Sequence, residues 1–193
     1  MNILAMDTSM GACSAAVLCA DGTAQSLHAR EALMALGHAE ALMPMVQEVL
    51  AKAGIAAREL DLIAATVGPG SFTGVRIAIA AARGLALATE AKLYGTDSLT
   101  VMARGALTRG LSPDGSFAVA VDAHRGMIYL GLYDEAGRRR EGPSLISPGD
   151  AANCLPRDLN VVVGSGAALL AGACGRQGRR IDTALSDLQP SAA

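Results

Sequence analysis

The stretch Asp61-Leu-Ile-Ala-Ala-Thr-Val-Gly-Pro-Gly-Ser-Phe-Thr-Gly74 decides how the first half of the chain folds. Its opening apolar run is typical of a buried strand, and the segment from Gly68 to Gly74 predicts a tight, glycine-rich turn. Residues 74–89 contain only two charged side chains, Arg76 and Arg83, so we expect a helix that is apolar nearly all round. A strand, a turn and a helix therefore follow one another here.

Upstream of this stretch, the pattern predicts three antiparallel strands and a helix. The Asp21-Gly22 pair indicates a hairpin turn, and apolar residues at helical spacing cover 38–53. Pro44 lies inside that spacing, so we expect the helix either to begin near 41–43 or to be kinked at Pro44. The three expected strands cover 2–7, 11–20 and 23–29. Downstream of the stretch, we expect a strand over 92–95 and a further helix over 98–109.

The same order of elements then begins again. A strand over 117–122 ends in an aspartate, as the strand over 2–7 does. The remaining expected elements are strands over 126–133, 138–146 and 161–163 and helices over 150–155 and 166–174. The sequence thus predicts an α/β protein with the pattern βββαβα twice, in an N-terminal lobe over 1–109 and a C-terminal lobe over 110–193.

Composition excludes several classes of protein. The 193 residues carry a net charge of −2, which argues against a protein that grips nucleic acid mainly by charge. A hydrophobic fraction of 51% argues against disorder. The start of the chain lacks a basic segment and reaches a carboxylate at Asp7, so we expect no signal peptide. The longest uncharged apolar run, residues 161–175, is shorter than the roughly 20 residues that span a bilayer, so we expect no membrane association. Four cysteines without CxxC spacing are typical of free thiols in a reducing cytoplasm.

The turn from Gly68 to Gly74 allows two interpretations. A strand, a glycine-rich turn and a helix N-terminus can hold a phosphate through backbone N–H groups. However, Thr73 stands where a dinucleotide fingerprint needs its third glycine, and no lysine precedes a hydroxyl residue as in a P-loop. The other interpretation is a plain tight turn, with Ser71 or Thr73 capping the helix.

Other polar residues allow similar alternatives. Asp7, Thr8 and Ser9 end the first strand, where they could hold a magnesium-bound phosphate or form a polar turn. The cluster of Asp122, His124 and Arg125 is either a polar site or a turn. The run Arg138–Arg140 is either a solvated group of charges that keeps a sheet edge from pairing with another chain, or a tRNA contact.

No metal site or nucleophile is predicted. His38 heads the first long helix, but the ligand position four residues on is Leu42. The two long helices suggest a different use. Methionines near the first helix and small residues along the second would suit a contact with another protein, whereas the alternative is a purely intramolecular core.

Three motifs carry a resemblance to a known family. They are Asn2-Ile-Leu-Ala-Met-Asp-Thr-Ser9 with Ala12-Cys-Ser14, His38 with Leu42-Met-Pro44, and Gly68-Pro-Gly-Ser-Phe-Thr-Gly-Val-Arg76. Together they resemble the TsaB (YeaZ-type) family of bacterial tRNA threonylcarbamoyladenosine biosynthesis proteins. The resemblance covers roughly residues 1–135, and the last motif is the most specific.

The resemblance implies an actin/Hsp70/sugar-kinase-like (ASKHA) fold with two βββαβα lobes and mixed sheets. It implies a cytoplasmic, non-catalytic subunit that forms a heterodimer with the TsaD-like catalytic subunit, which a TsaE-like ATPase joins. The complex would place N6-threonylcarbamoyl on adenosine 37 of tRNAs reading codons that begin with A, and tRNA would be contacted through the complex. Alone, the chain would form a homodimer.

The resemblance also implies roles for particular residues. TsaD-like proteins hold a metal through His-x-x-x-His on the first helix, and Leu42 removes the second ligand here. A nucleotide site, weak or vestigial for ATP or ADP, would comprise Asp7, Thr8, Ser9, Gly68, Gly70, Ser71, Thr73 and Gly74. We expect the partner interface to include His38, Leu42, Met45, Val49, Arg76, Ile79 and Arg83.

Two expectations stay open at this point. The family usually has a further C-terminal helix that packs back on the first lobe, and this sequence stops about where that helix would begin. The alternative function is an independent ASKHA-type ATPase or kinase, or a glycoprotease-like (M22) peptidase. The peptidase needs a metal or a nucleophile–base pair, and the kinase needs a second phosphate loop, for which Gly164-Ser-Gly166 is the one candidate.

Overall fold

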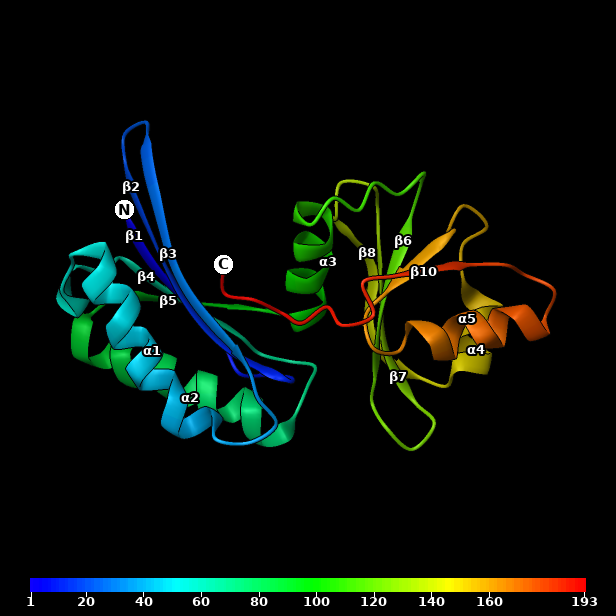
Figure 1. The fold of residues 1–193 in the computed structure, drawn as a ribbon, viewed down its shortest axis with the longest axis horizontal. Coiled ribbons are helices and arrows are strands. Elements are labelled where there is room, and N and C mark those ends of the chain that lie inside the picture. The colour runs from blue at the N-terminus through cyan, green and yellow to red at the C-terminus, as the bar shows by residue number, and fades with distance from the viewer. The chain divides into compact units, whose positions relative to one another are not determined.

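The computed structural model describes residues 1–193 and divides them into two compact units. Unit 1 comprises Met1–Ser98 together with Pro190–Ala193, and unit 2 comprises Leu99–Gln189. Each unit contains one five-stranded mixed sheet with helices (Figure 1).

Unit 1 has the strand order β3-β2-β1-β4-β5. Strands β1, β2 and β3 are antiparallel neighbours, whereas β4 and β5 run parallel to β1. The strands are β1 (Asn2–Asp7), β2 (Ala12–Asp21), β3 (Ala24–Leu33), β4 (Leu62–Thr66) and β5 (Lys92–Thr96). The helices are α1 (His38–Ala53), the short 3-10 turn η1 (Ala57–Glu59) and α2 (Phe72–Thr89).

Unit 2 repeats this topology, with β8, β7, β6, β9 and β10 in the places of β3, β2, β1, β4 and β5. Its strands are β6 (Phe117–Asp122), β7 (Ile128–Tyr133), β8 (Arg139–Ile146), β9 (Val161–Val163) and β10 (Asp182–Ala184). Its helices are α3 (Ser98–Thr108), α4 (Pro148–Cys154) and α5 (Ala167–Arg176). The actin/Hsp70/sugar-kinase-like fold with two βββαβα lobes is thus confirmed; β5 matches the strand expected over 92–95, and unit 2 adds β10.

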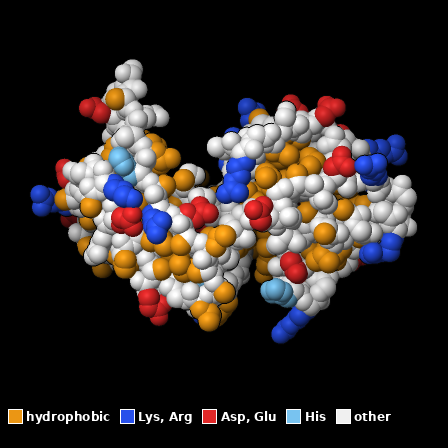
Figure 2. Space-filling view, in the orientation of Figure 1, with side chains coloured by type: hydrophobic (Ala, Val, Ile, Leu, Met, Phe, Trp, Pro, Cys, Tyr) orange, Lys and Arg blue, Asp and Glu red, His pale blue; other side chains and the backbone are white.

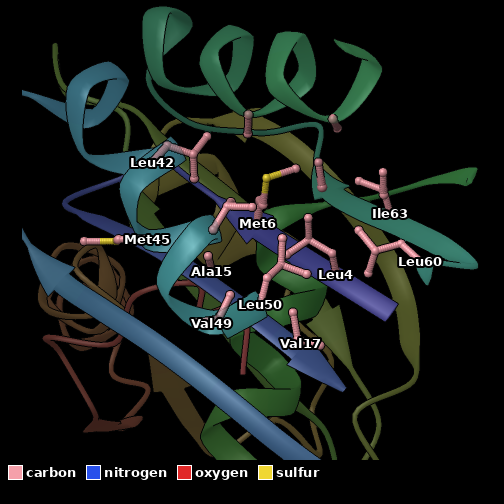
Figure 3. Packing of buried hydrophobic residues seen from close by; sticks show 14 of the residues in the cluster. Leu4, Met6, Ala15, Val17, Leu42, Met45, Val49, Leu50, Leu60 and Ile63 are labelled. Atoms are coloured by element: carbon pink, nitrogen blue, oxygen red, sulfur yellow. The ribbon is translucent and has the colours of Figure 1, made fainter. Parts of the chain in front are cut away.

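One face of the unit 1 sheet forms the core with α1 and α2. Leu4 and Met6 of β1 point toward Leu42 and Val49 of α1 (Figure 3). Helix α2 contributes mainly small buried side chains, Gly74, Ala78 and Ala82, spaced one turn apart. This spacing lets the α2 backbone lie close to the sheet while the rest of its surface stays outside the core.

Several boundaries differ from the expected ones. Helix α1 begins at His38 rather than near 41–43, because Pro44 lies on its exposed side and the carbonyl that loses its bond there can face water. Strand β3 runs four residues beyond Ala29, because backbone pairing with β2 extends through a polar edge strand. Strand β10 was not predicted, because Asp182-Thr-Ala184 lacks the apolar run that revealed the equally short β9.

The boundary between the compact units also differs from the expected lobe boundary after 109. Helix α3 belongs to unit 2 from Leu99 onward. Its Arg104 Nη1 donates to the Ala136 carbonyl at 2.9 Å, and its Thr100 hydroxyl lies 3.3 Å from the Tyr133 hydroxyl. These contacts attach α3 to the sheet of unit 2, so the first segment of unit 1 ends at Ser98.

Candidate functional site

A buried polar cluster closes the carboxyl end of β1. Both oxygens of Asp7 accept hydrogen bonds: Oδ1 from the Ser9 N–H at 3.1 Å, and Oδ2 from the Ser9 hydroxyl at 2.8 Å and from the Thr66 hydroxyl. The Ser98 hydroxyl in turn donates to the Ser9 hydroxyl at 3.1 Å. Asp7, Ser9 and Ser98 are buried. The cluster therefore joins the ends of β1 and β4 to Ser98 within unit 1.

Burial dominates the electrostatics of this cluster. It raises the pKa of Asp7 above its ordinary value, although the hydrogen bonds from Thr66 and Ser9 and the nearby His38 act in the opposite direction. Burial, together with the charge of Asp7, also raises the pKa of the Cys13 thiol to about 11. The thiol is therefore protonated near neutral pH, which is unlike a reactive cysteine.

The glycine-rich turn packs directly onto the end of β1. The Ser71 N–H donates to the Ser9 carbonyl at 2.7 Å, and the Thr8 hydroxyl donates to the Gly74 carbonyl at 2.6 Å. A Cβ at Gly70 would lie 2.2 Å from the Ser9 carbonyl oxygen, and one at Gly74 would lie 2.0 Å from that of Thr8. Both glycines are thus required by close backbone approach.

The structure therefore brings the predicted nucleotide residues together, but much of their hydrogen-bonding capacity is used internally. Asp7, Thr8 and Ser9 are buried, and Ser71 caps α2 by accepting from the Gly74 N–H at 3.3 Å. Gly68 accepts from the Ser98 N–H at 2.9 Å, whereas Thr73 is exposed. Of the two interpretations of the turn, this geometry favours the tight turn with Ser71 as its cap.

His38 does not face a second metal ligand. Its Nε2 lies 3.1 Å from the Met10 carbonyl, which ties the start of α1 to the turn after β1. Leu42, the residue four positions on, is buried in the core. No group of three or more His, Cys, Asp or Glu side chains is placed to hold a metal ion.

The residues expected at the partner interface separate into two groups. Leu42, Met45 and Val49 are buried against the sheet, so they cannot contact a partner directly and are removed from the proposed interface. Arg76 and Arg83 of α2 are exposed, and Ile79 is half-buried. The periodicity of α1 had identified its apolar face, and in this fold that face is the core.

Sequence reasoning missed the exposed apolar residues of α2. Phe72 is 71% exposed and Leu87 is 88% exposed. With Arg76, Ala80 and Arg83 they form one stripe along the helix, because residues three or four positions apart lie on the same side. We call Phe72, Arg76, Ala80, Arg83 and Leu87 the α2 stripe. The guanidinium of Arg76 lies over the Phe72 ring, 3.5 Å from its centroid.

The α2 stripe is an unusual surface for an isolated protein. Hydrophobic side chains gather on the side of unit 1 that carries α1 and α2 (Figure 2). Helix α2 is also the one helix long and apolar enough to cross a membrane by length and composition, a test that core helices of soluble proteins also pass. Phe72 and Leu87 stand at opposite ends of the stripe, and exposed apolar surface that extends along a helix is typical of a protein or membrane contact.

Unit 2 holds the other predicted polar residues. The Asp122 carboxylate accepts from the His124 N–H at 2.7 Å, and His124 and Arg125 adopt positive φ values of 62° and 54°. This arrangement is a turn between β6 and β7. Arg140 pairs with Asp158 at 3.2 Å, and the whole run Arg138–Arg140 is exposed.

The glycine pair of unit 2 packs as its counterpart does in unit 1. The Gly166 N–H donates to the Ala120 carbonyl at 2.9 Å, and a Cβ at Gly164 would lie 2.5 Å from that oxygen. Ser165 accepts from the Asp122 N–H at 3.1 Å. The segment that could have supplied a second phosphate loop is therefore a close turn against β6.

Comparisons with known proteins agree with this architecture. A family model described as "TsaD: tRNA N6-adenosine threonylcarbamoyltransferase" matches residues 32–160. The tRNA threonylcarbamoyladenosine biosynthesis protein TsaB of Escherichia coli is 41% identical over 71% of this chain and 58% of its own length. The TsaB protein of Haemophilus influenzae is 32% identical over 86% of this chain and 72% of its own length.

Solved structures give the same result at the level of the fold. An uncharacterized Pseudomonas aeruginosa protein with similarity to peptidase YEAZ is 32% identical, with a TM-score of 0.82 over 99% of this chain and 86% of that one. A structure of YeaZ from Pseudomonas aeruginosa is 30% identical, with a TM-score of 0.80 over the same shares. The chain spans less than two thirds of the Escherichia coli relative but most of these two structures.

Proposed function

Because the chain belongs to the TsaB family of tRNA threonylcarbamoyladenosine biosynthesis proteins, we propose that it is the non-catalytic, partner-binding subunit of the complex that modifies adenosine 37. It heterodimerises with a TsaD-like catalytic subunit in the cytoplasm, and a TsaE-like ATPase joins the pair. Contact with tRNA comes through the complex. Without its partner, the chain pairs weakly with a second copy of itself.

The exposed α2 stripe is the observation that carries this proposal. Phe72 and Leu87 leave large apolar surfaces in water, and burying such surface is worth about 25 cal/mol per Å². A specific protein interface buries about 1,600 Å² in total, an area that an 18-residue helix and its neighbours can supply. A partner that covers α2 would therefore remove Phe72 and Leu87, two of the most exposed large apolar side chains of unit 1, from water.

The chemistry of the remaining residues supports a non-catalytic role. Leu42 has no ligand atom at the position where TsaD-like proteins are expected to place a second histidine, and it is packed in the core. Asp7 is engaged by Ser9 and Thr66, which leaves it poorly placed to hold a magnesium-bound phosphate. An independent ATPase, kinase or peptidase would need groups that are free to reach a substrate.

The proposal is tested by mixing the chain with the TsaD-type protein of the same organism. Size-exclusion chromatography with light scattering should give a one-to-one complex that replaces any homodimer. Reconstituted threonylcarbamoyl transfer to tRNA should depend on the presence of this chain and on the TsaD-type protein. If the two proteins elute separately at micromolar concentration, the subunit role is wrong; if the chain alone hydrolyses ATP or cleaves a protein, the alternative holds.

A further inference from the structure

The charge pattern of the α2 stripe carries an inference about what covers it, and this inference rests on the proposed function. Arg76 and Arg83 form no ion pair, and α2 contains no acidic residue from Phe72 to Thr89. Glu90 follows α2 directly as its C-cap residue, but no ion pair joins it to either arginine. Two acids of neighbouring elements are already engaged: Glu48 of α1 pairs with Lys52 and Arg30, and Glu59 of η1 accepts from the Ala56 N–H. The stripe therefore presents two unneutralised cations among apolar side chains.

The order of residues along the stripe is nearly palindromic. Phe72 and Leu87 lie equally far in sequence from the midpoint between Ile79 and Ala80, and so do Arg76 and Arg83. In a two-fold symmetric dimer, the same patch of both copies meets itself in opposite directions. If two α2 helices cross at that midpoint, Arg76 of each copy lies opposite Arg83 of the other copy. The dimer then contains two such pairs of arginines.

Self-pairing thus brings like charges together in a surface that excludes water. Like-charge contacts in such a place weaken association strongly, whereas opposite charges favour the correct partner. The two arginines are seven residues apart, which places them on the same side of α2 and about 10 Å apart along its axis. A partner helix with two carboxylates at the same spacing would neutralise both at once.

We propose that the α2 stripe selects a protein partner whose matching helix carries two carboxylates about 10 Å apart, and that Arg76 and Arg83 disfavour the homodimer. The small side chain of Ala80 between them lets the partner helix approach closely. The arginines are therefore specificity-determining residues, and the apolar ends of the stripe, Phe72 and Leu87, supply the general attraction.

The first test is the salt dependence of two equilibria, each measured by analytical ultracentrifugation between about 0.1 M and about 1 M NaCl. Added salt shortens the Debye length from about 10 Å to about 3 Å. Affinity for the TsaD-type protein should fall as salt rises, because attraction is screened. Self-association of the chain should strengthen, because repulsion is screened. Two equilibria with the same salt dependence would overturn the proposal.

The second test reverses one charge. Arg83→Glu should weaken binding to the TsaD-type protein about tenfold or more. It should also tighten the homodimer, because the new carboxylate of each copy then faces Arg76 of the other. Adding Arg76→Glu to the same chain should weaken the homodimer again, since like charges meet once more. A merely structural role for Arg83 would not change the two equilibria in opposite directions.

The matched control is Arg109→Glu, which makes the same change in charge at an exposed residue of unit 2. It should change neither equilibrium by more than about twofold at 0.15 M salt. Circular dichroism confirms that each variant is folded.

Failure of this proposal is distinguishable from failure of the proposed function. If the wild-type chain binds the TsaD-type protein but Arg83→Glu binds equally well, the subunit role stands and the charge inference is wrong. If the chain instead binds phosphatidylserine vesicles or free tRNA, and Arg83→Glu abolishes that binding, the occupant of the stripe is a membrane or an RNA. Either result overturns the assignment to an acidic protein face.

Discussion

Asp7 illustrates at the scale of one residue how a carboxylate can be retained for structure. It is nearly inaccessible, and donors from Ser9 and Thr66 surround it. Its presence at the end of the first strand was predicted, and so was the glycine-rich turn. That the two are joined was not predictable, because nothing in the sequence specifies that the Ser71 N–H reaches the Ser9 carbonyl.

A pH prediction follows from the buried carboxylate. Burial raises the pKa of Asp7 in the folded state, so the native protein binds this proton more tightly than the unfolded chain does. The associated stability is present below the ordinary pKa near 3.8 and is lost as pH rises through the folded-state value. Each unit of this rise corresponds to about 1.4 kcal/mol.

Asp7→Asn should therefore remove part of the decline in stability as the pH rises above about 4, because an amide has no charge to desolvate. Urea unfolding of both proteins across this range measures the difference. Asp21→Asn, at an exposed carboxylate, is the matched control and should leave the decline unchanged. A variant and wild type with parallel pH profiles would show that Asp7 does not contribute in this way.

The same residue gives a ligand prediction. The oxygens of Asp7 and the hydroxyls of Thr8 and Ser9 are already hydrogen-bonded. Calorimetric titration with ATP or ADP and Mg²⁺ should therefore give a dissociation constant weaker than about 1 mM. Tighter binding that Asp7→Asn abolishes would instead assign a functional nucleotide site to this cluster.

At the scale of an element, α2 contains two glycines with opposite roles. A Cβ at Gly74 would meet the Thr8 carbonyl, whereas a Cβ at Gly84 would have nothing within 4 Å. Gly74→Ala should lower the free energy of unfolding by about 2 kcal/mol or more, because backbone must move. Gly84→Ala should raise it by about 1 kcal/mol, because alanine is the better helix former.

Chemical denaturation of the isolated chain measures both glycine variants against wild type. Since the two substitutions are identical and lie in one helix, propensity alone would shift them in the same direction. Equal effects of the two substitutions would show that the close contact between the turn and β1 is not formed.

Partner contacts can be separated from core contacts by exposure. Leu87→Ser should change the free energy of unfolding by less than about 0.5 kcal/mol, since Leu87 is 88% exposed, but it should weaken partner binding. Met45→Asp should instead destabilise the fold, because Met45 is buried on the core side of α1. Leu145→Ser, at an exposed leucine of β8, is the control for Leu87.

The measurements are unfolding by urea and titration of the TsaD-type protein in the same buffer. Unchanged partner affinity in Leu87→Ser would remove this end of α2 from the interface. A folded Met45→Asp variant with lost partner binding would return α1 to the interface.

The elements explain which parts of the site could be predicted. Strong periodicity located α1 and its apolar side, but that side became the core, and so Leu42 and Val49 were assigned to the wrong surface. Helix α2 is apolar on most sides, so its sequence carries little information about which side faces the sheet. The buried side follows only from Gly74 and Ala78, whose small size permits close packing.

At the scale of the whole molecule, the repeat of βββαβα was the most predictable feature. It depended on strand alternation and on aspartates ending two corresponding strands, Asp7 and Asp122. The division of the chain was less predictable, because the helical pattern of α3 does not reveal which sheet it joins. Contacts such as that of Arg104 with Ala136 decide the question, and they are visible only in three dimensions.

The chain passes between the two units twice, after Ser98 and before Pro190, and both passages are tied to neighbouring residues of unit 1. The Ser98 hydroxyl donates to Ser9, next to the end of β1. After the second passage, the Ala192 N–H donates to the Ser14 hydroxyl at 3.0 Å, and Ser14 is the cross-strand neighbour of Asp7. The buried cluster thus anchors the first passage, and Ser14 of β2, beside the cluster, anchors the second.

Removing these anchors should loosen the passages without unfolding either sheet. Ser98→Ala should speed amide hydrogen exchange in the peptide that contains residues 97–100, and Ser14→Ala should do so in the peptide that contains residues 190–193. Each rate should rise about fivefold to tenfold, because each variant loses one hydrogen bond worth about 1 kcal/mol. If the cluster acts as one anchor, the double variant should exceed the sum of the two effects in free energy. Ser26→Ala, on exposed β3, should change neither peptide. Strict additivity would mean that the two passages are held independently, and a loss of protection throughout β1 and β2 would mean that the cluster stabilises the sheet itself.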